Sequence, residues 1–170
     1  MWRRGKQAPG MPTHADLWSQ LENVSGWIRH ADAKLATLIA FVGLAGGGLY
    51  VTAQGKAPVW IIMVAAAAGL GLVISGLLAF AGLLPRRPYS PSSTRDRIYY
   101  RAIANDYTGP DAYARDLLSA RSDLRANLAR QIYANSCVAD RKFVLATWST
   151  AFLLVALAML VTVAAFRVFA

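Results

Sequence analysis

Three long stretches of the chain contain no charged residue and are rich in apolar side chains. They cover residues 35–53, 58–84 and 143–166 and are 19, 27 and 24 residues long. About 20 apolar residues in a helix span the hydrocarbon core of a bilayer. One such stretch is compatible with a buried core helix, but a chain of 170 residues is too short to enclose three of them. The pattern therefore predicts three transmembrane helices.

The segment before the first stretch has the pattern of an amphipathic helix. Thr13, followed three residues later by Asp16, is typical of a helix start. Apolar residues then recur at steps of four and three, which places them on one helical face: Leu17, Leu21, Val24, Ile28, Ala31 and Leu35. No breaker separates this stripe from the first apolar stretch, so we expect one helix from about Ala15 to Ala53.

The segment between the second and third stretches is predicted to be mainly helical. A Pro- and Ser-rich exit at residues 85–93 precedes a short helix, predicted at about residues 94–107, and a turn at residues 106–110. From Asp111 to Lys142 there is neither Pro nor Gly. We therefore expect one long helix from Asp111, entering the third stretch unbroken and reaching Arg167.

The basic residues are distributed unevenly about the three stretches. The chain has 18 Lys and Arg against 9 Asp and Glu, and sixteen of the eighteen lie in residues 1–34 and 85–142. The positive-inside rule predicts that these two segments are cytoplasmic and that the C-terminus lies outside. The predicted fold class is an all-α integral membrane protein with three transmembrane helices, whose helical cytosolic extensions form a small cytosolic helical domain.

Composition and motifs exclude several classes of protein. A chain that is 56% hydrophobic and 16% charged is not disordered, and one Cys cannot form a disulfide scaffold. Membrane-flanking bases account for the net charge of +9, so a nucleic-acid polymer is not expected as a partner. His14, His30 and Cys137 have no metal-ligand spacing, and no phosphate-binding glycine motif is present. We predict no enzyme activity, no metal and no cofactor.

Charged residues stand at the cytosolic edge of the first and third stretches. Because these stretches are predicted to run in parallel, the two groups arrive at the same depth: Asp32 and Lys34, then Asp140, Arg141 and Lys142. One interpretation is simple anchoring of helix ends by bases at the membrane surface. The other is a salt-bridged relay that carries a cytosolic event into the membrane.

Small residues recur at helical spacing within the apolar stretches. Gly43 and Gly47 form a GxxxG pair in the first stretch. In the second, four small residues follow at steps of four: Ala67, Gly71, Ser75 and Ala79. Small faces let helix backbones approach closely in lipid, so they predict packing between spans or between copies of the chain.

The densest polar stretch, residues 95–101, is a candidate binding surface. Arg97 and Arg101 have the chemistry to hold a phosphate and Tyr100 to stack a base, with Gln131 facing them from the long helix. The alternative is a solvated helix face with Tyr at the headgroup level. Periodicity does not decide between a nucleotide-binding site and this alternative.

Four short motifs resemble those of the transmembrane effectors of Pycsar antiphage systems. They are the segment from Trp27 to Ile39, which resembles W…AD-x-K-A-x-x-L-L, and then Tyr99-Tyr-Arg-Ala-Ile103, Leu128-Ala-Arg-Gln-Ile132 and Asp140-Arg-Lys-Phe143. The motifs lie between Trp27 and Phe143, and the resemblance as a whole covers the chain from about Leu17 to Phe166. The evidence lies in their order and in their position relative to the apolar stretches.

The resemblance implies a function. In such systems a partner cyclase makes a cyclic pyrimidine nucleotide, cyclic CMP or cyclic UMP, on phage infection. The effector then damages the bacterial inner membrane, so that the infected cell dies early. The resemblance thus implies that this chain is the component that kills the infected cell. Separately, we expect it to act as a homo-oligomer and to need no cofactor. The alternative is a membrane scaffold whose basic helices bind anionic lipid or a partner protein. A transporter is less favoured because the apolar stretches hold no Asp, Glu, Lys, Arg or His.

Overall fold

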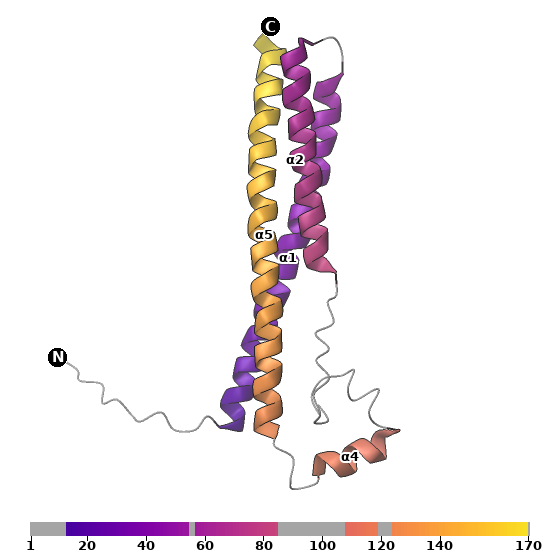
Figure 1. The fold of residues 1–170 in the computed structure, drawn as a ribbon, viewed down its shortest axis with the longest axis vertical. Helices are drawn as coiled ribbons and strands as arrows, with labels where there is room; N and C mark the ends of the chain where they lie inside the picture. The colour runs from indigo at the N-terminus through magenta and orange to yellow at the C-terminus, as the bar shows by residue number, and fades with distance from the viewer. Residues whose placement is uncertain (1–12, 55–56, 85–107, 119–123, 170) are drawn as a thin grey trace, which may run out of the picture. The chain divides into compact units, whose positions relative to one another are not determined.

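The computed structural model describes residues 13–54, 57–84, 108–118 and 124–169, and every regular element among them is an α-helix (Figure 1). The helices are α1 (His14–Ala53), α2 (Val59–Leu83), α4 (Pro110–Leu118) and α5 (Leu124–Phe169). Helices α1, α2 and α5 are each long and apolar enough to cross a membrane. The predicted fold, an all-α chain with three membrane helices, is therefore confirmed.

Helix α1 begins where the sequence predicts, at a reciprocal cap. The Thr13 backbone N–H donates to the Asp16 carboxylate at 2.8 Å, and the Asp16 N–H donates to the Thr13 hydroxyl at 3.2 Å. The same hydroxyl donates to Asp16 at 2.7 Å, and this bond, followed by the backbone bond, lowers the pKa of Asp16. These bonds satisfy donors that a helix start leaves without partners. The expected helix from Ala15 to Ala53 is confirmed to within one residue.

The expected single helix from Asp111 into the membrane differs from the structure. Helix α4 ends at Leu118 and α5 begins at Leu124, whereas residues 119–123 lie outside the described residues. The prediction rests on the absence of Pro and Gly, but Ser122 and Asp123 directly precede α5. Ser and Asp favour helix caps over helix interiors. The predicted helix at residues 94–107 also lies outside the described residues.

The described residues divide into two compact units. The first contains residues 13–26, 108–118 and 124–136. In it, Leu17 and Val24 of α1 and Leu128 of α5 are buried, and the Arg125 guanidinium donates to the His14 imidazole at 3.4 Å. The second unit contains residues 27–54, 57–84 and 137–169, which are the membrane parts of α1, α2 and α5.

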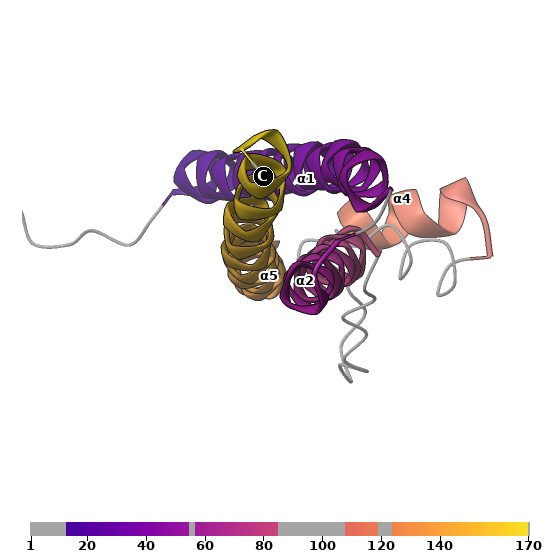
Figure 2. The ribbon, with the colours of Figure 1, turned by 90° about the horizontal axis from the view of Figure 1, so that it is seen from above.

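The second unit is a bundle of three helices, each packed against the other two (Figures 1 and 2). Residue pairs that contact each other across α2 and its two neighbours give the relative directions of the helices. As the residue number rises along α1 or α5, the number of its contact on α2 falls. The pairs are Leu35 with Gly82, Leu49 with Gly69, Ser149 with Ser75, and Phe166 with Trp60. Helix α2 is therefore antiparallel to both α1 and α5, so α1 and α5 run in parallel.

Buried positions in the bundle recur at steps of three, four or seven residues, and we call these positions the seam. On α2 the seam residues are Ile61, Ala68, Leu72, Ser75, Ala79 and Gly82. On α5 they are Ala139, Ala146, Ser149, Leu153, Ala156 and Val163. A mean spacing of 3.5 residues is the repeat of a left-handed coiled coil.

Close backbone packing holds the bundle together, because lipid gives no hydrophobic driving force between helices. A Cβ atom added to Gly71 would lie 3.2 Å from the Cβ of Ala156, and one added to Gly82 would lie 2.7 Å from a Leu35 methyl group. The outer face instead carries large exposed apolar side chains such as Phe41 and Leu77. This distribution is typical of a bundle surrounded by lipid.

Candidate functional site

An ion pair joins α1 to α5 at the edge of their apolar parts. The Lys142 ammonium is paired with the Asp32 carboxylate, and the two side chains are 14% and 38% exposed. Next to Asp32 on α1, Ala31 is fully buried, as is Leu35 one turn further on. The partly buried setting lowers the local dielectric, which strengthens the attraction between the two charges. The pair thus connects the two helices where each enters its membrane segment.

The other charged residues predicted for this edge are more exposed. The Lys34 ammonium lies 5.6 Å from the ring centroid of Phe143, which follows Lys142 on α5. This distance is within the range of a cation–π contact. Asp140 and Arg141 are exposed on α5. The structure therefore brings Asp32 to Lys142 and Lys34 to Phe143, and leaves Asp140 and Arg141 at the surface.

A second polar contact lies deeper in the bundle, between α2 and α5. The Ser75 hydroxyl donates to the Ser149 backbone carbonyl at 2.8 Å, and the Ser149 hydroxyl donates to the Ser75 carbonyl at 2.9 Å. The two hydroxyl oxygens are 3.0 Å apart, and both side chains are fully buried. These crossed bonds join two helices within the apolar segment.

The small residues predicted to pack helices lie in two different settings. Gly71 faces Ala156 across the α2–α5 contact, and Ala79 is fully buried. Gly43 and Gly47 are exposed on α1, and a Cβ atom added to either would meet no side chain or neighbouring helix of the described residues within 4 Å. Ala67 is exposed as well. Residues spaced by four move gradually off a helical face that repeats every 3.5 residues. Ala67 therefore lies beside the seam, and its neighbour Ala68 occupies the buried position.

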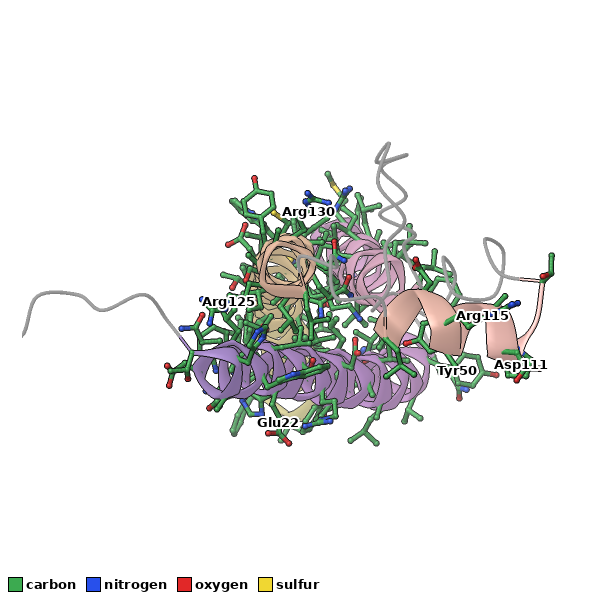
Figure 3. All side chains as sticks on the ribbon, turned by 90° about the horizontal axis from the view of Figure 1, so that it is seen from below. Glu22, Tyr50, Asp111, Arg115, Arg125 and Arg130 are labelled. Atoms are coloured by element: carbon green, nitrogen blue, oxygen red, sulfur yellow. The ribbon has the colours of Figure 1, made fainter. Side chains whose placement is uncertain are left out.

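The first unit carries several amide and guanidinium groups on α5. The Gln131 amide donates to the Asn135 side chain at 3.4 Å, and an Arg130 nitrogen lies 3.5 Å from the Asn127 side-chain oxygen. Asn127 is only 6% exposed. Arg125 and Arg130 lie on different sides of α5 (Figure 3). The other predicted ligand contacts, Arg97, Tyr100 and Arg101, lie outside the described residues.

Sequence reasoning missed two polar residues that the structure shows to be buried. Ser149 is one of them, and it is fully buried. It lies seven residues from both Lys142 and Ala156, and this spacing places all three residues on one helical face. Asn127 is the other, and it precedes the buried Leu128 in the predicted apolar stripe. A search for the 3.5-residue repeat along α5 finds Ser149. No sequence signal distinguishes Asn127 from a solvated Asn.

The described residues contain no cluster of three or more His, Cys, Asp or Glu side chains that could hold a metal ion. Cys137 and His30 are both exposed.

Comparison with known proteins identifies the family. The family model of the Pycsar effector protein domain matches residues 16–169. This chain belongs to that family. The Pycsar effector protein PtPycTM of Propioniciclava tarda is 33% identical over 141 residues, which cover 79% of this chain and 70% of that protein. No solved structure matches the chain.

Membership in the Pycsar effector family agrees with the three membrane helices. The chain is a membrane protein and a transmembrane effector of antiphage defence. The family is one of membrane effectors and is not a known class of enzymes. The resemblance found in the four sequence motifs is therefore confirmed at the level of the family.

Proposed function

We propose that a cyclic pyrimidine nucleotide, cyclic CMP or cyclic UMP, activates this effector, which then impairs the inner membrane and causes abortive infection. A partner cyclase supplies the nucleotide, and the effector itself performs no enzymatic step. The observation that carries the proposal is the continuity of α1 and α5. Each is one helix from a polar segment into a membrane segment, and Asp32 and Lys142 join the two helices at the transition.

The nucleotide is proposed to bind in the first unit. Asn and Gln amides offer both donors and acceptors, which suit the edge of a pyrimidine ring, and arginines suit a cyclic phosphate. On α5, Gln131 provides such an amide, and Arg130 is exposed. Arg97, Tyr100 and Arg101 remain the proposed contacts to phosphate and base.

The charged residues at the membrane edge are proposed to relay the signal. A ligand that moves the first part of α5 moves Lys142 with it, because α5 is a single helix from Leu124 to Phe169. The ion pair with Asp32 then transmits the movement to α1. Lys34, Asp140 and Arg141 hold the helix ends at the lipid headgroups.

Copies of the chain are proposed to associate through α1. Gly43 and Gly47 lie one turn apart on its exposed face, where a Cβ atom added to either would meet no side chain or neighbouring helix of the described residues within 4 Å. Close approach of two such faces permits van der Waals contact between backbones. Repacking of the helices within this homo-oligomer would then open or disrupt the bilayer.

The proposed topology has the N-terminus and the central region in the cytoplasm and the C-terminus outside. We expect a C-terminal alkaline phosphatase fusion to be active and a C-terminal GFP fusion to be dark, since each reporter works on one side of the inner membrane only. Fusions placed after residue 85 are the matched control and should give the opposite pattern. An inactive phosphatase with a fluorescent GFP at the C-terminus would reverse the topology.

Direct binding tests the proposed ligand. We expect calorimetric titration of the full chain in nanodiscs to detect cyclic CMP or cyclic UMP at micromolar or lower concentration, with cyclic AMP and cyclic GMP as controls. Gln131→Ala should weaken binding about tenfold, because it removes the proposed hydrogen bond from the Gln131 amide to the pyrimidine ring. Leaving a buried polar group of the nucleotide without its partner costs about 1–3 kcal/mol. Glu22→Ala is the control, since Glu22 is exposed on the side of α1 turned away from α5 (Figure 3). Absence of binding by all four nucleotides would favour a scaffold that binds anionic lipid.

A further inference from the structure

The hydroxyl groups of Ser75 and Ser149 bond differently from other hydroxyls on the same helices. Seven other Ser and Thr hydroxyls of the described helices donate to a carbonyl one turn earlier on their own helix, namely those of Ser25, Thr37, Thr52, Ser136, Thr147, Thr150 and Thr162. Ser75 and Ser149 instead donate to each other's backbone carbonyl across the α2–α5 contact. Both hydrogen bonds therefore depend on the two helices staying together.

The position of this contact connects it to the ion pair at the membrane edge. Ser149 follows Lys142 by seven residues, which is about 10.5 Å along a helix axis. A spacing of seven returns to the same seam position of a coiled coil. A rotation or shift of α5 that displaces Lys142 from Asp32 therefore also displaces Ser149 from Ser75.

Each hydroxyl has an alternative acceptor on its own helix. The carbonyl of Gly71 lies one turn before Ser75, and that of Leu145 lies one turn before Ser149. Helical Ser residues commonly bond to this carbonyl, as the seven other hydroxyls do. Separation of α2 from α5 in lipid then leaves neither hydroxyl without a partner, so the contact is reversible.

We infer that Ser75 and Ser149 form a reversible clamp that holds α2 against α5 in the resting bundle, and that its release is the step that permits membrane damage. The two serines position α2 against α5 through their hydrogen bonds. The inference rests on the proposed function in one respect, namely that the chain damages the membrane. Its tests use leakage without nucleotide, so they do not depend on the identity of the ligand.

The first test locks the clamp. In a Cys137→Ser background, Ser75→Cys and Ser149→Cys are combined, and the protein is oxidised in dye-filled vesicles. Hydroxyl oxygens 3.0 Å apart place the two sulfur atoms close enough to form a disulfide. We expect cross-linking within the chain and about tenfold less leakage, restored by a reductant. Ser75→Cys with Thr150→Cys is the control and should not cross-link, because Thr150 is exposed.

The second test removes the clamp. Ser75→Ala with Ser149→Ala should raise nucleotide-free leakage by roughly 3- to 20-fold, the range spanned by measured hydrogen bonds between membrane helices. Thr147→Val with Thr150→Val removes two hydroxyls that bond within α5 and should leave leakage unchanged.

The outcomes separate the clamp from the proposed function. Leakage from the locked protein equal to that of its reduced form would overturn the inference, as would an alanine variant that leaks no more than its valine control. A wild-type protein that responds to no nucleotide would contradict the proposed function alone. In that case, higher leakage from the alanine variant still supports the clamp.

Discussion

Lys142→Glu should abolish nucleotide-triggered membrane damage while the protein still inserts into the membrane. The Lys142 side chain is only 14% exposed and faces Asp32, so a glutamate there would bring two carboxylates together. Breaking a fully buried ion pair costs about 3–5 kcal/mol, and we expect about 2 kcal/mol at this partly exposed site. Dye release from vesicles and the Tm in nanodiscs measure the two effects.

Two further variants distinguish the effect of breaking the ion pair from the effect of changing the net charge. Arg141→Glu makes the same charge change on the adjacent, exposed residue, and we expect membrane damage within about twofold of the wild-type level because exposed charges contribute little. Asp32→Lys combined with Lys142→Glu restores an opposite-charge pair and should recover most of the lost activity. If Lys142→Glu and Arg141→Glu had equal effects, the relay would be wrong and simple anchoring would account for these residues.

The membrane helices could be predicted from sequence because a helix that spans a bilayer must be long, apolar and free of charge. Charge-free stretches of sufficient length identify α1, α2 and α5, and the Thr13–Asp16 cap gives the start of α1. Both signals are local. The boundary between α4 and α5 was not predicted because the segment from Asp111 to Lys142 contains neither Pro nor Gly, the strongest helix breakers. Ser122 and Asp123, which precede α5, are a weaker signal.

The contacts between helices could be predicted only in part. Opposite charges at equal depth suggested that α1 and α5 meet near Asp32 and Lys142, which the structure pairs. The partner of Ser75 was not predicted, because it depends on the register of α2 against α5. Register is a tertiary property, and an isolated helix pattern carries no information about it. The proposed nucleotide site combines residues of several segments, so helix patterns carry even less information about it.

Gly71→Leu should force α2 away from α5 and cause leakage without nucleotide. A Cβ atom at this position already lies 3.2 Å from the Cβ of Ala156 and 3.6 Å from the backbone oxygen of Phe152, which cannot move independently of α5. Overpacking of this kind costs about 1–3 kcal/mol. The hydroxyl pair of Ser75 and Ser149 lies one helical turn away and would be pulled apart. Vesicle leakage and the Tm in nanodiscs measure the result.

The matched control for this variant is Ala67→Leu, which adds the same side chain one turn earlier on α2. Ala67 is exposed, so the added atoms enter lipid, and we expect the Tm and the leakage to stay close to those of the wild type. Gly71→Ala should fall between the two, because it adds only the Cβ atom. Equal leakage from Gly71→Leu and Ala67→Leu would mean that the α2–α5 contact does not hold the bundle in its resting state. A graded series from Ala67→Leu through Gly71→Ala to Gly71→Leu would instead tie membrane damage to the separation of these two helices.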